Sequence, residues 1–320
     1  MAEKKTRLAA MHLALSLLEK RRSSRIYAII NTGSGEHLCA PTLRTLFKNR
    51  KKFQNIETLE VLLHSPGGHA EIAYSTIKFL RKHCKRLNVL VPMYAKSAAT
   101  LMCLGADTIF MGEFAELGPL DVQITDVYDR GQAPFSPLDE FKSMEFLREY
   151  ATELLNYFST LMIGIAGMSV KEAIHEAIPA VTGLMAPLYQ RVDPSKVGGY
   201  RRSLAVGEDY AVRLLRQRGI KKADEIVEKL VWGYPSHSFV IDMEEAAGLG
   251  LPVVQLPASQ EEILLNVVLG ASEHGLSFYG FAEAQPKVAT AKTKAKKRAR
   301  RRPVPAEPKD GDRPRAIAGS

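Results

Sequence analysis

Two short segments of this chain have the residue types needed for chemistry on a carbonyl group. An apolar run opens into Ser65-Pro66-Gly67-Gly68, and Ser97 follows 29 residues after Gly68, in Ala95-Lys96-Ser97-Ala98-Ala99-Thr100. Glycine amides let a substrate oxygen approach the main chain, and a serine among small neighbours at the start of a helix has an accessible hydroxyl. Both groups must reach the same carbon atom. We therefore predict Ser97 as nucleophile and the amides of Gly67, Gly68 and Ala98 as oxyanion donors.

Each segment also has a purely structural interpretation. Pro66 fixes its own φ and biases Ser65 towards extended geometry, so Pro-Gly-Gly alone makes an ordinary turn from strand to helix. A serine such as Ser97 is often only the N-cap of the helix that follows it. The order and spacing of the two segments favour the functional interpretation.

Strand and helix patterns alternate around these segments. The predicted strands are Arg25–Asn31, Thr58–Leu63, Asn88–Val91 and Thr108–Met111, and the helices between them are Pro41–Lys51, Ala70–His83 and Ser97–Leu104. Repeated units of this length favour an α/β fold with a parallel sheet covered by helices.

The second half of the chain has mainly helical patterns. We predict helices at Leu138–Ile165, Val170–Ala177, Pro194–Arg218, Lys222–Leu230 and Glu261–Leu269, with a last short strand at Phe239–Ile241. The expected organisation is an N-terminal helix over residues 1–24, a main domain over residues 25–285 and a tail over residues 286–320.

The excess positive charge lies in the tail. The net charge is +9, and residues 287–320 hold 12 Lys or Arg and 3 Asp or Glu, which leaves 32 basic and 32 acidic residues in the rest. A tail rich in Lys, Arg and Pro should be disordered. Through residues 287–315 it can touch nucleic acid, an anionic surface or an acidic partner, but a solvated, weakly binding tail is the simpler interpretation.

Composition excludes several other classes of protein. The three cysteines are an odd number at wide spacing, which indicates a reducing compartment and no disulfide framework or thiolate zinc site. We expect no metal and no cofactor, because no ligand set has zinc spacing and no Gly-x-Gly-x-x-Gly or Walker motif occurs. No apolar run is long enough to span a membrane, so a cytoplasmic protein is expected.

Three runs carry a family resemblance: Leu62–Gly68, Ala95–Thr100 and Glu116–Asp121. Together they resemble the Clp-fold serine peptidases, and among them the serine dehydrogenase proteinase family, related to signal peptide peptidase A. The resemblance covers about Arg25 to Leu269. It implies a ClpP/crotonase-like repeated ββα spiral, ATP-independent cleavage of peptides or proteins, and a homo-oligomer. It also leaves a position at the periphery of the inner membrane open.

The general base is not settled by the resemblance. Caseinolytic Clp peptidases carry a histidine after the serine, but the matching stretch here has Leu117 or Gly118 in that place. Relatives of the signal peptide peptidase type use a lysine further along the chain, and Lys142 stands where that lysine would be. A lysine base must be neutral, which needs burial or a nearby positive charge. The alternative, that Lys142 is one more solvated helix charge, stays open.

His237 is the second candidate base. A histidine accepts protons readily near neutral pH, and Asp242 follows five residues later and could orient the ring. The simpler interpretation is a histidine in a turn at the edge of the subunit.

Three functions therefore remain in competition. The first is a serine peptidase that acts through an acyl-enzyme. The second is a catalytically silent Clp-fold scaffold that binds partners or nucleic acid through its basic tail. The third is a crotonase-type acyl-thioester enzyme, which the serine at a helix start and the lack of paired active-site glutamates count against.

Overall fold

The computed structural model describes residues 2–32, 36–120, 137–273, 275 and 277–282, without the side chains of residues 2–5 and 137–140. These residues lie in one compact unit, Met1–Gln285. The predicted tail, residues 286–320, and the contact segment 287–315 within it are outside the described residues.

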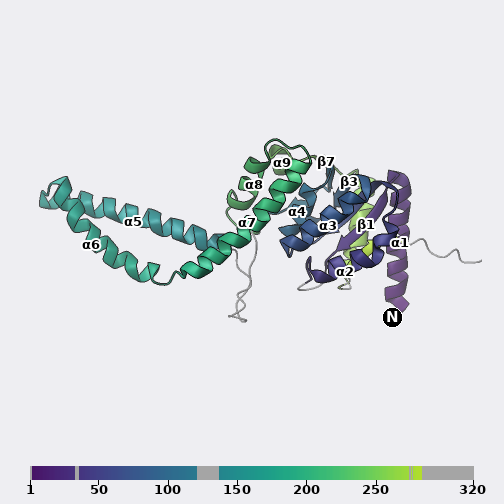
Figure 1. The fold of residues 1–320 in the computed structure, drawn as a ribbon, viewed down its shortest axis with the longest axis horizontal. Helices are drawn as coiled ribbons and strands as arrows, with labels where there is room; N and C mark the ends of the chain where they lie inside the picture. Colours follow the sequence, from purple (N-terminus) through teal and green to yellow (C-terminus); the bar gives the residue numbers. More distant parts are fainter. Residues whose placement is uncertain (1, 33–35, 121–136, 274, 276, 283–320) are drawn as a thin grey trace, which may run out of the picture. The chain divides into compact units, whose positions relative to one another are not determined.

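A six-stranded sheet forms the centre of this unit (Figure 1). Its strands are β1 (Arg25–Ile30), β2 (Ile56–His64), β3 (Cys84–Val91), β5 (Thr108–Met111), β7 (Val253–Gln255) and β8 (Phe278–Phe281). They lie in the order β7-β5-β3-β2-β1-β8, and all neighbours are parallel except β8, which runs antiparallel to β1. The predicted α/β class is confirmed, whereas β7 and β8 were not predicted.

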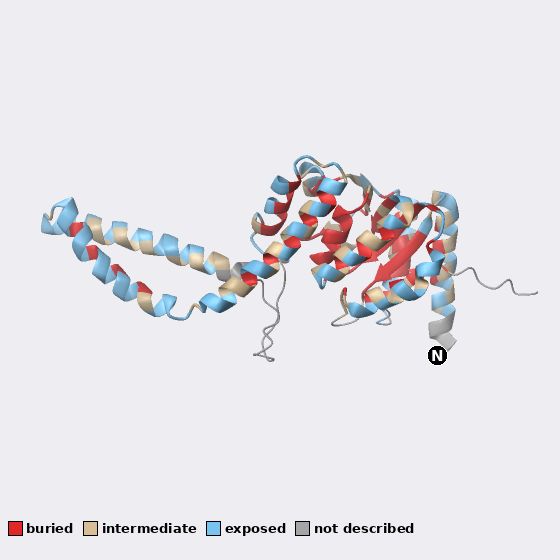
Figure 2. Ribbon diagram, viewed as in Figure 1, coloured by how far each residue is buried: buried red, intermediate tan, exposed pale blue. Residues whose placement is uncertain are grey.

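Helices cover both faces of the sheet because alternate side chains of each strand point in opposite directions. The helices concerned are α1 (Ala2–Arg22), α2 (Ala40–Asn49), α3 (Ala70–Lys82), α4 (Ala98–Leu104) and α10 (Ala258–Ser272). Ile26, Ala28 and Ile30 of β1 pack in a cluster with α1 and α10. Tyr27 and Ile29 belong to the larger cluster that includes α2, α3 and α4. Figure 2 shows the strands between these helices as buried.

The second half is helical, as predicted. It contains α5 (Pro137–Ala166), α6 (Val170–Tyr189), α7 (Pro194–Gln217), α8 (Ala223–Trp232) and α9 (Met243–Gly248). None of the helices in the described part of the chain combines the length and apolarity needed to cross a bilayer.

The predicted end of a helix at Ala177 is wrong. Helix α6 continues through Pro179 and Pro187 to Tyr189, although an interior proline costs a backbone hydrogen bond. Helix α6 packs along α5. Its buried residues lie at four-residue spacing and form one face: Ala173, Ala177, Val181 and Met185. This packing outweighs the local cost of the prolines.

The predicted strand Phe239–Ile241 is also wrong. Only Ile241 pairs, through an isolated antiparallel bridge to Leu117, while the Phe239 amide donates to the Ser236 carbonyl in a turn. The partner strand β6 (Glu116–Leu117) is two residues long and already pairs with β4 (Tyr94–Ala95) in a second, two-stranded sheet. One bridge therefore replaces the expected strand.

Candidate active site

The glycine turn after β2 lies directly against the turn that carries Ser97. Gly67 and Gly68 have φ of +117° and +135°, which side chains rarely tolerate. A Cβ atom on Gly67 would lie 2.8 Å from the Ser97 Cβ and 2.9 Å from the Lys96 carbonyl oxygen. A Cβ atom on Gly68 would lie 2.4 Å from the Leu38 carbonyl oxygen. Each glycine is therefore required by close backbone approach, and the two turns meet.

Ser97 has an unusual backbone conformation, with φ +51° and ψ −121°. Residues other than glycine adopt such angles only when their surroundings impose them, at a cost of about 1–3 kcal/mol. The serine stands at the N-cap position of α4, yet its hydroxyl makes no capping hydrogen bond. A serine presented on a sharp strand-to-helix turn is typical of a nucleophile elbow. The positive φ was not predictable from the sequence.

The Ser97 side chain borders a small cavity. Its lining residues are Gly68, Ala70, Ser97, Ala98, Leu101, Leu120 and Gly207. The Gly67 amide donates to the Ser65 hydroxyl at 3.2 Å. In the described part of the chain, the amides of Gly68 and Ala98 have no hydrogen-bond acceptor. Gly68 and Ala98, whose amides are unused as donors, thus line the same apolar cavity as Ser97.

Thr100 ties the serine turn to its neighbours, a role that the sequence analysis missed. Its side chain is fully buried, and its hydroxyl donates to the Ala95 carbonyl at 2.7 Å. The same oxygen accepts the Gly118 amide at 3.0 Å. The only signal in the sequence was a threonine three residues after the serine.

Replacing Thr100 with valine should lower the free energy of unfolding by about 2 kcal/mol, because the buried Ala95 carbonyl and Gly118 amide each lose a partner. Thr100→Ser should retain most of this stability. Thr152→Val, which removes an exposed hydroxyl bond to the Arg148 carbonyl, should change stability by less than about 0.5 kcal/mol. Urea unfolding measures all three variants, and equal stability of Thr100→Val and wild type would contradict this role.

Lys142 lies on the first turns of α5, against the segment that follows α8. Its Nζ donates to the Tyr234 carbonyl at 2.7 Å, and the neighbouring Phe141 ring packs edge-on against Trp232. Among the described residues no hydrogen bond joins Lys142 to Ser97, and Lys142 does not line the Ser97 cavity. The structure thus brings the glycines and Ser97 together but leaves Lys142 beside Tyr234.

His237 lies in the segment between α8 and α9 and is also absent from the cavity lining. Asp242, the expected partner of this ring, accepts the Glu245 amide at 2.8 Å through its carboxylate and caps α9. Lys96 adjoins Ser97, but its Nζ forms an ion pair with Glu116. The Lys96 amine is therefore engaged with Glu116.

Residues 2–131, which include both turns, match the sequence profile of the ClpP-like SDH-type serine proteinases. This part of the chain is therefore similar to that family. The ClpP-like SDH-type profile thus covers the glycine turn, Ser97 and β6, but it ends before Lys142 and His237. It follows that the family match bears on the nucleophile segment and not on the base.

Two relatives of the chain are uncharacterized proteins of Methanocaldococcus jannaschii. One is 28% identical over 195 residues, which are 61% of this chain and 53% of the relative. The other is 24% identical over 208 residues, which are 64% of this chain and 56% of the relative. The chain therefore spans about half the length of the curated relatives it matches.

Two solved structures similar to this chain are mutant forms of a membrane-bound stomatin-specific protease. The first, in complex with a substrate peptide, has a TM-score of 0.41 and 13% identity, and the match covers 74% of this chain and 78% of that one. The second has a TM-score of 0.27 and 16% identity, with 47% and 68% covered.

Proposed function

We propose that this protein is an ATP-independent serine peptidase in which Ser97 forms the acyl-enzyme. The observation that carries the proposal is the shared hollow of Ser97 and the unused amides of Gly68 and Ala98. The Ser97 oxygen attacks the peptide carbonyl carbon, and the two amides hold the negative oxygen that results. The peptide C–N bond breaks as the base returns the serine proton to the leaving amine, and water then attacks the acyl carbon, releasing a carboxylic acid and regenerating the Ser97 hydroxyl.

Lys142 is our choice of general base. A neutral amine that donates one N–H to the Tyr234 carbonyl still has its lone pair available for the Ser97 proton. Catalytic hydrogen bonds are often long without substrate and shorten when it binds. The 2.7 Å bond to Tyr234 would then orient the amine, and substrate binding would shorten its distance to the serine.

The cavity also favours a particular substrate. Its walls are small or aliphatic side chains beside the nucleophile, chiefly Ala70, Leu101 and Leu120. An apolar pocket of this kind rejects charged side chains because their burial would be unpaired. The cavity of about 10 Å³ has room for little more than one water-sized group. We therefore propose a peptide or protein substrate with a small, apolar residue on the acyl side of the cleaved bond.

Two further parts of the proposal concern the oligomeric state and the cellular location of the protein. We propose a homo-oligomer, on the basis of the family resemblance and of the exposed apolar side chains on α5 and α6. Cytoplasmic localisation, with membrane association left open, and weak contacts of the tail with nucleic acid or an anionic surface stay predictions.

A fluorophosphonate probe tests the nucleophile. Wild type should be labelled at a single serine, and Ser97→Ala should abolish the labelling, because Ser97 supplies the hydroxyl among the described residues that line the cavity with Gly68 and Ala98. Ser75→Ala, at an exposed position on α3, is the matched control and should label fully. Labelling that survives in Ser97→Ala would overturn the proposal.

Lys142→Arg tests the base. Arginine can still donate to the Tyr234 carbonyl but cannot accept a proton, so peptide turnover should fall by about 10²–10⁴-fold. His237→Ala should retain turnover. The opposite pair of results would make His237 the base.

The silent scaffold is the competing function, and the observation in its favour is that neither candidate base is among the described residues that line the Ser97 cavity. Absence of probe labelling in the wild type, with retention on nucleic acid or anionic lipid that requires residues 287–315, would establish it.

A further inference from the structure

Helix α5 has an exposed stripe of apolar side chains, made of Phe146, Tyr150, Tyr157 and Leu161. Spacings of four and seven residues place them on one face of the helix. Glu149 and Glu153 are exposed between them. Figure 2 shows most of α5 as exposed or intermediate. We call these six residues the acidic stripe; nothing in the catalytic proposal uses it.

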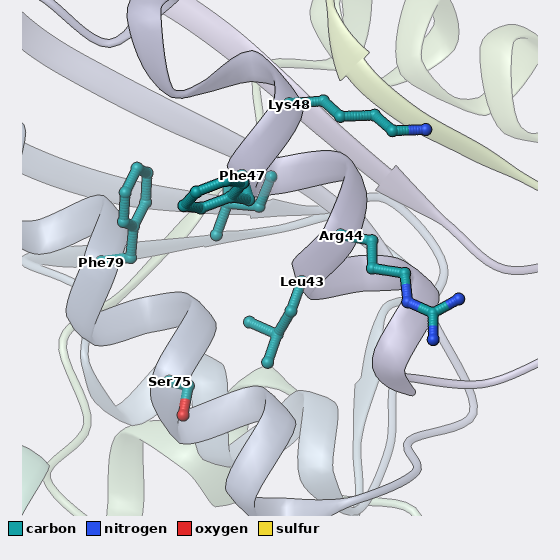
Figure 3. A pocket seen from close by; sticks show the side chains of 7 residues that line it. Leu43, Arg44, Phe47, Lys48, Ser75 and Phe79 are labelled. Atoms are coloured by element: carbon teal, nitrogen blue, oxygen red, sulfur yellow. The ribbon is translucent and has the colours of Figure 1, made fainter.

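A groove of about 560 Å³ between α2 and α3 is lined by apolar side chains together with basic ones, where the stripe has acidic ones. Figure 3 shows Leu43, Phe47 and Phe79 gathered in it, with Arg44 and Lys48 extending from the other side of α2. Residues 40–52, which form α2 and the 3₁₀ turn η1 (Arg50–Lys52), hold five basic residues and no acidic one. We call this the basic groove.

Charge and shape make these two surfaces complementary, and we infer that the acidic stripe of one copy binds in the basic groove of a second copy. The inference rests on the proposed homo-oligomer and names its contact. Phe47 and Phe146 are each 62% exposed, so the described part of the chain covers neither surface.

The size of the surfaces fits such a contact. Four half-exposed side chains, three of them aromatic, supply on the order of 400 Å², about half of the roughly 800 Å² that each partner of a stable interface buries. The acidic and basic side chains around them would form the polar rim.

Charge also argues against two other occupants. Two acidic stripes in contact would set Glu149 and Glu153 against their own copies, which is unfavourable. An anionic lipid surface would repel the same glutamates. Because the stripe and the groove are different surfaces, the contact is head-to-tail and joins further copies to a ring or a chain.

Charge reversal tests the inference by sedimentation velocity over a range of concentrations. Lys48→Glu and Glu149→Lys should each weaken self-association by about 10-fold, and the double variant Lys48→Glu/Glu149→Lys should restore it. Phe47→Ala and Phe146→Ala should each weaken it by about 10-fold or more. Glu176→Lys, an exposed charge reversal on α6, is the matched control and should have no effect.

The outcomes separate the inference from the proposed function. An oligomer that persists unchanged in Phe47→Ala and Lys48→Glu would overturn the inference while leaving the homo-oligomer intact. Stronger association in Glu149→Lys alone would instead indicate contact between two stripes and would also overturn it. A wild type that is monomeric at all concentrations would contradict both the proposed homo-oligomer and the inferred contact. Probe labelling of Ser97 would still test the peptidase function separately.

Discussion

Replacing Gly67 with alanine should reduce peptide turnover by at least about 100-fold and lower the free energy of unfolding by about 3 kcal/mol. The added Cβ would lie 2.8 Å from the Ser97 Cβ and 2.9 Å from the Lys96 carbonyl oxygen. The φ of +117° would also be strained for any side chain. The two turns would have to separate, which moves Ser97 away from the Gly68 amide. Turnover with a model peptide and urea unfolding measure the two effects.

Gly219→Ala is the matched control for Gly67→Ala. Gly219 also has a positive φ, +76°, but a Cβ there would have no atom within 4 Å. Its cost should be backbone strain alone, about 1 kcal/mol, with turnover unchanged. If Gly67→Ala behaved like Gly219→Ala, the close contact between the turns would be wrong.

His64 should make the protein lose stability as the pH falls below neutral. Its side chain is 2% exposed, its ring packs against Tyr94, and its buried Nδ1 has no hydrogen-bond partner among the described residues. Burial lowers the pKa of His64 to about 4, from 6.5 in its ordinary state. The unfolded chain therefore binds this proton first as the pH falls.

The sign and size of the effect follow from that difference in pKa. The stabilisation from neutral His64 is complete above pH 6.5 and is lost as the pH falls from 6.5 towards 4, by up to about 3 kcal/mol. His64→Phe should remove this part of the pH dependence of the free energy of unfolding, measured in urea from pH 4 to 8. His175→Phe, at a position with an 85% exposed side chain, should retain it. A parallel pH dependence in wild type and His64→Phe would contradict the assignment.

The central sheet could be predicted from the sequence because its strands are continuous apolar runs separated by helical patterns. Burial on both faces produces such runs in β1 and in the last residues of β2 and β3. Local patterns predicted the wrong end for α6, because packing along α5 keeps two prolines inside the helix. It also failed for β8, which depends on the exposed edge of β1 as a partner distant in sequence.

The candidate site was predictable in part. Residue types and spacing pointed to the glycine pair and Ser97, and close backbone approach explains why glycine is needed there. The φ of Ser97, the role of Thr100 and the Tyr234 partner of Lys142 come from contacts between distant segments. No local pattern encodes such contacts.

A crystal structure of the protein inhibited by a peptidyl phosphonate would test the central claim most directly. We predict a covalent bond from phosphorus to the Ser97 oxygen, with the phosphonyl oxygen about 2.7–3.1 Å from the amide nitrogens of both Gly68 and Ala98. An adduct on another residue, or a phosphonyl oxygen turned away from these two amides, would contradict it.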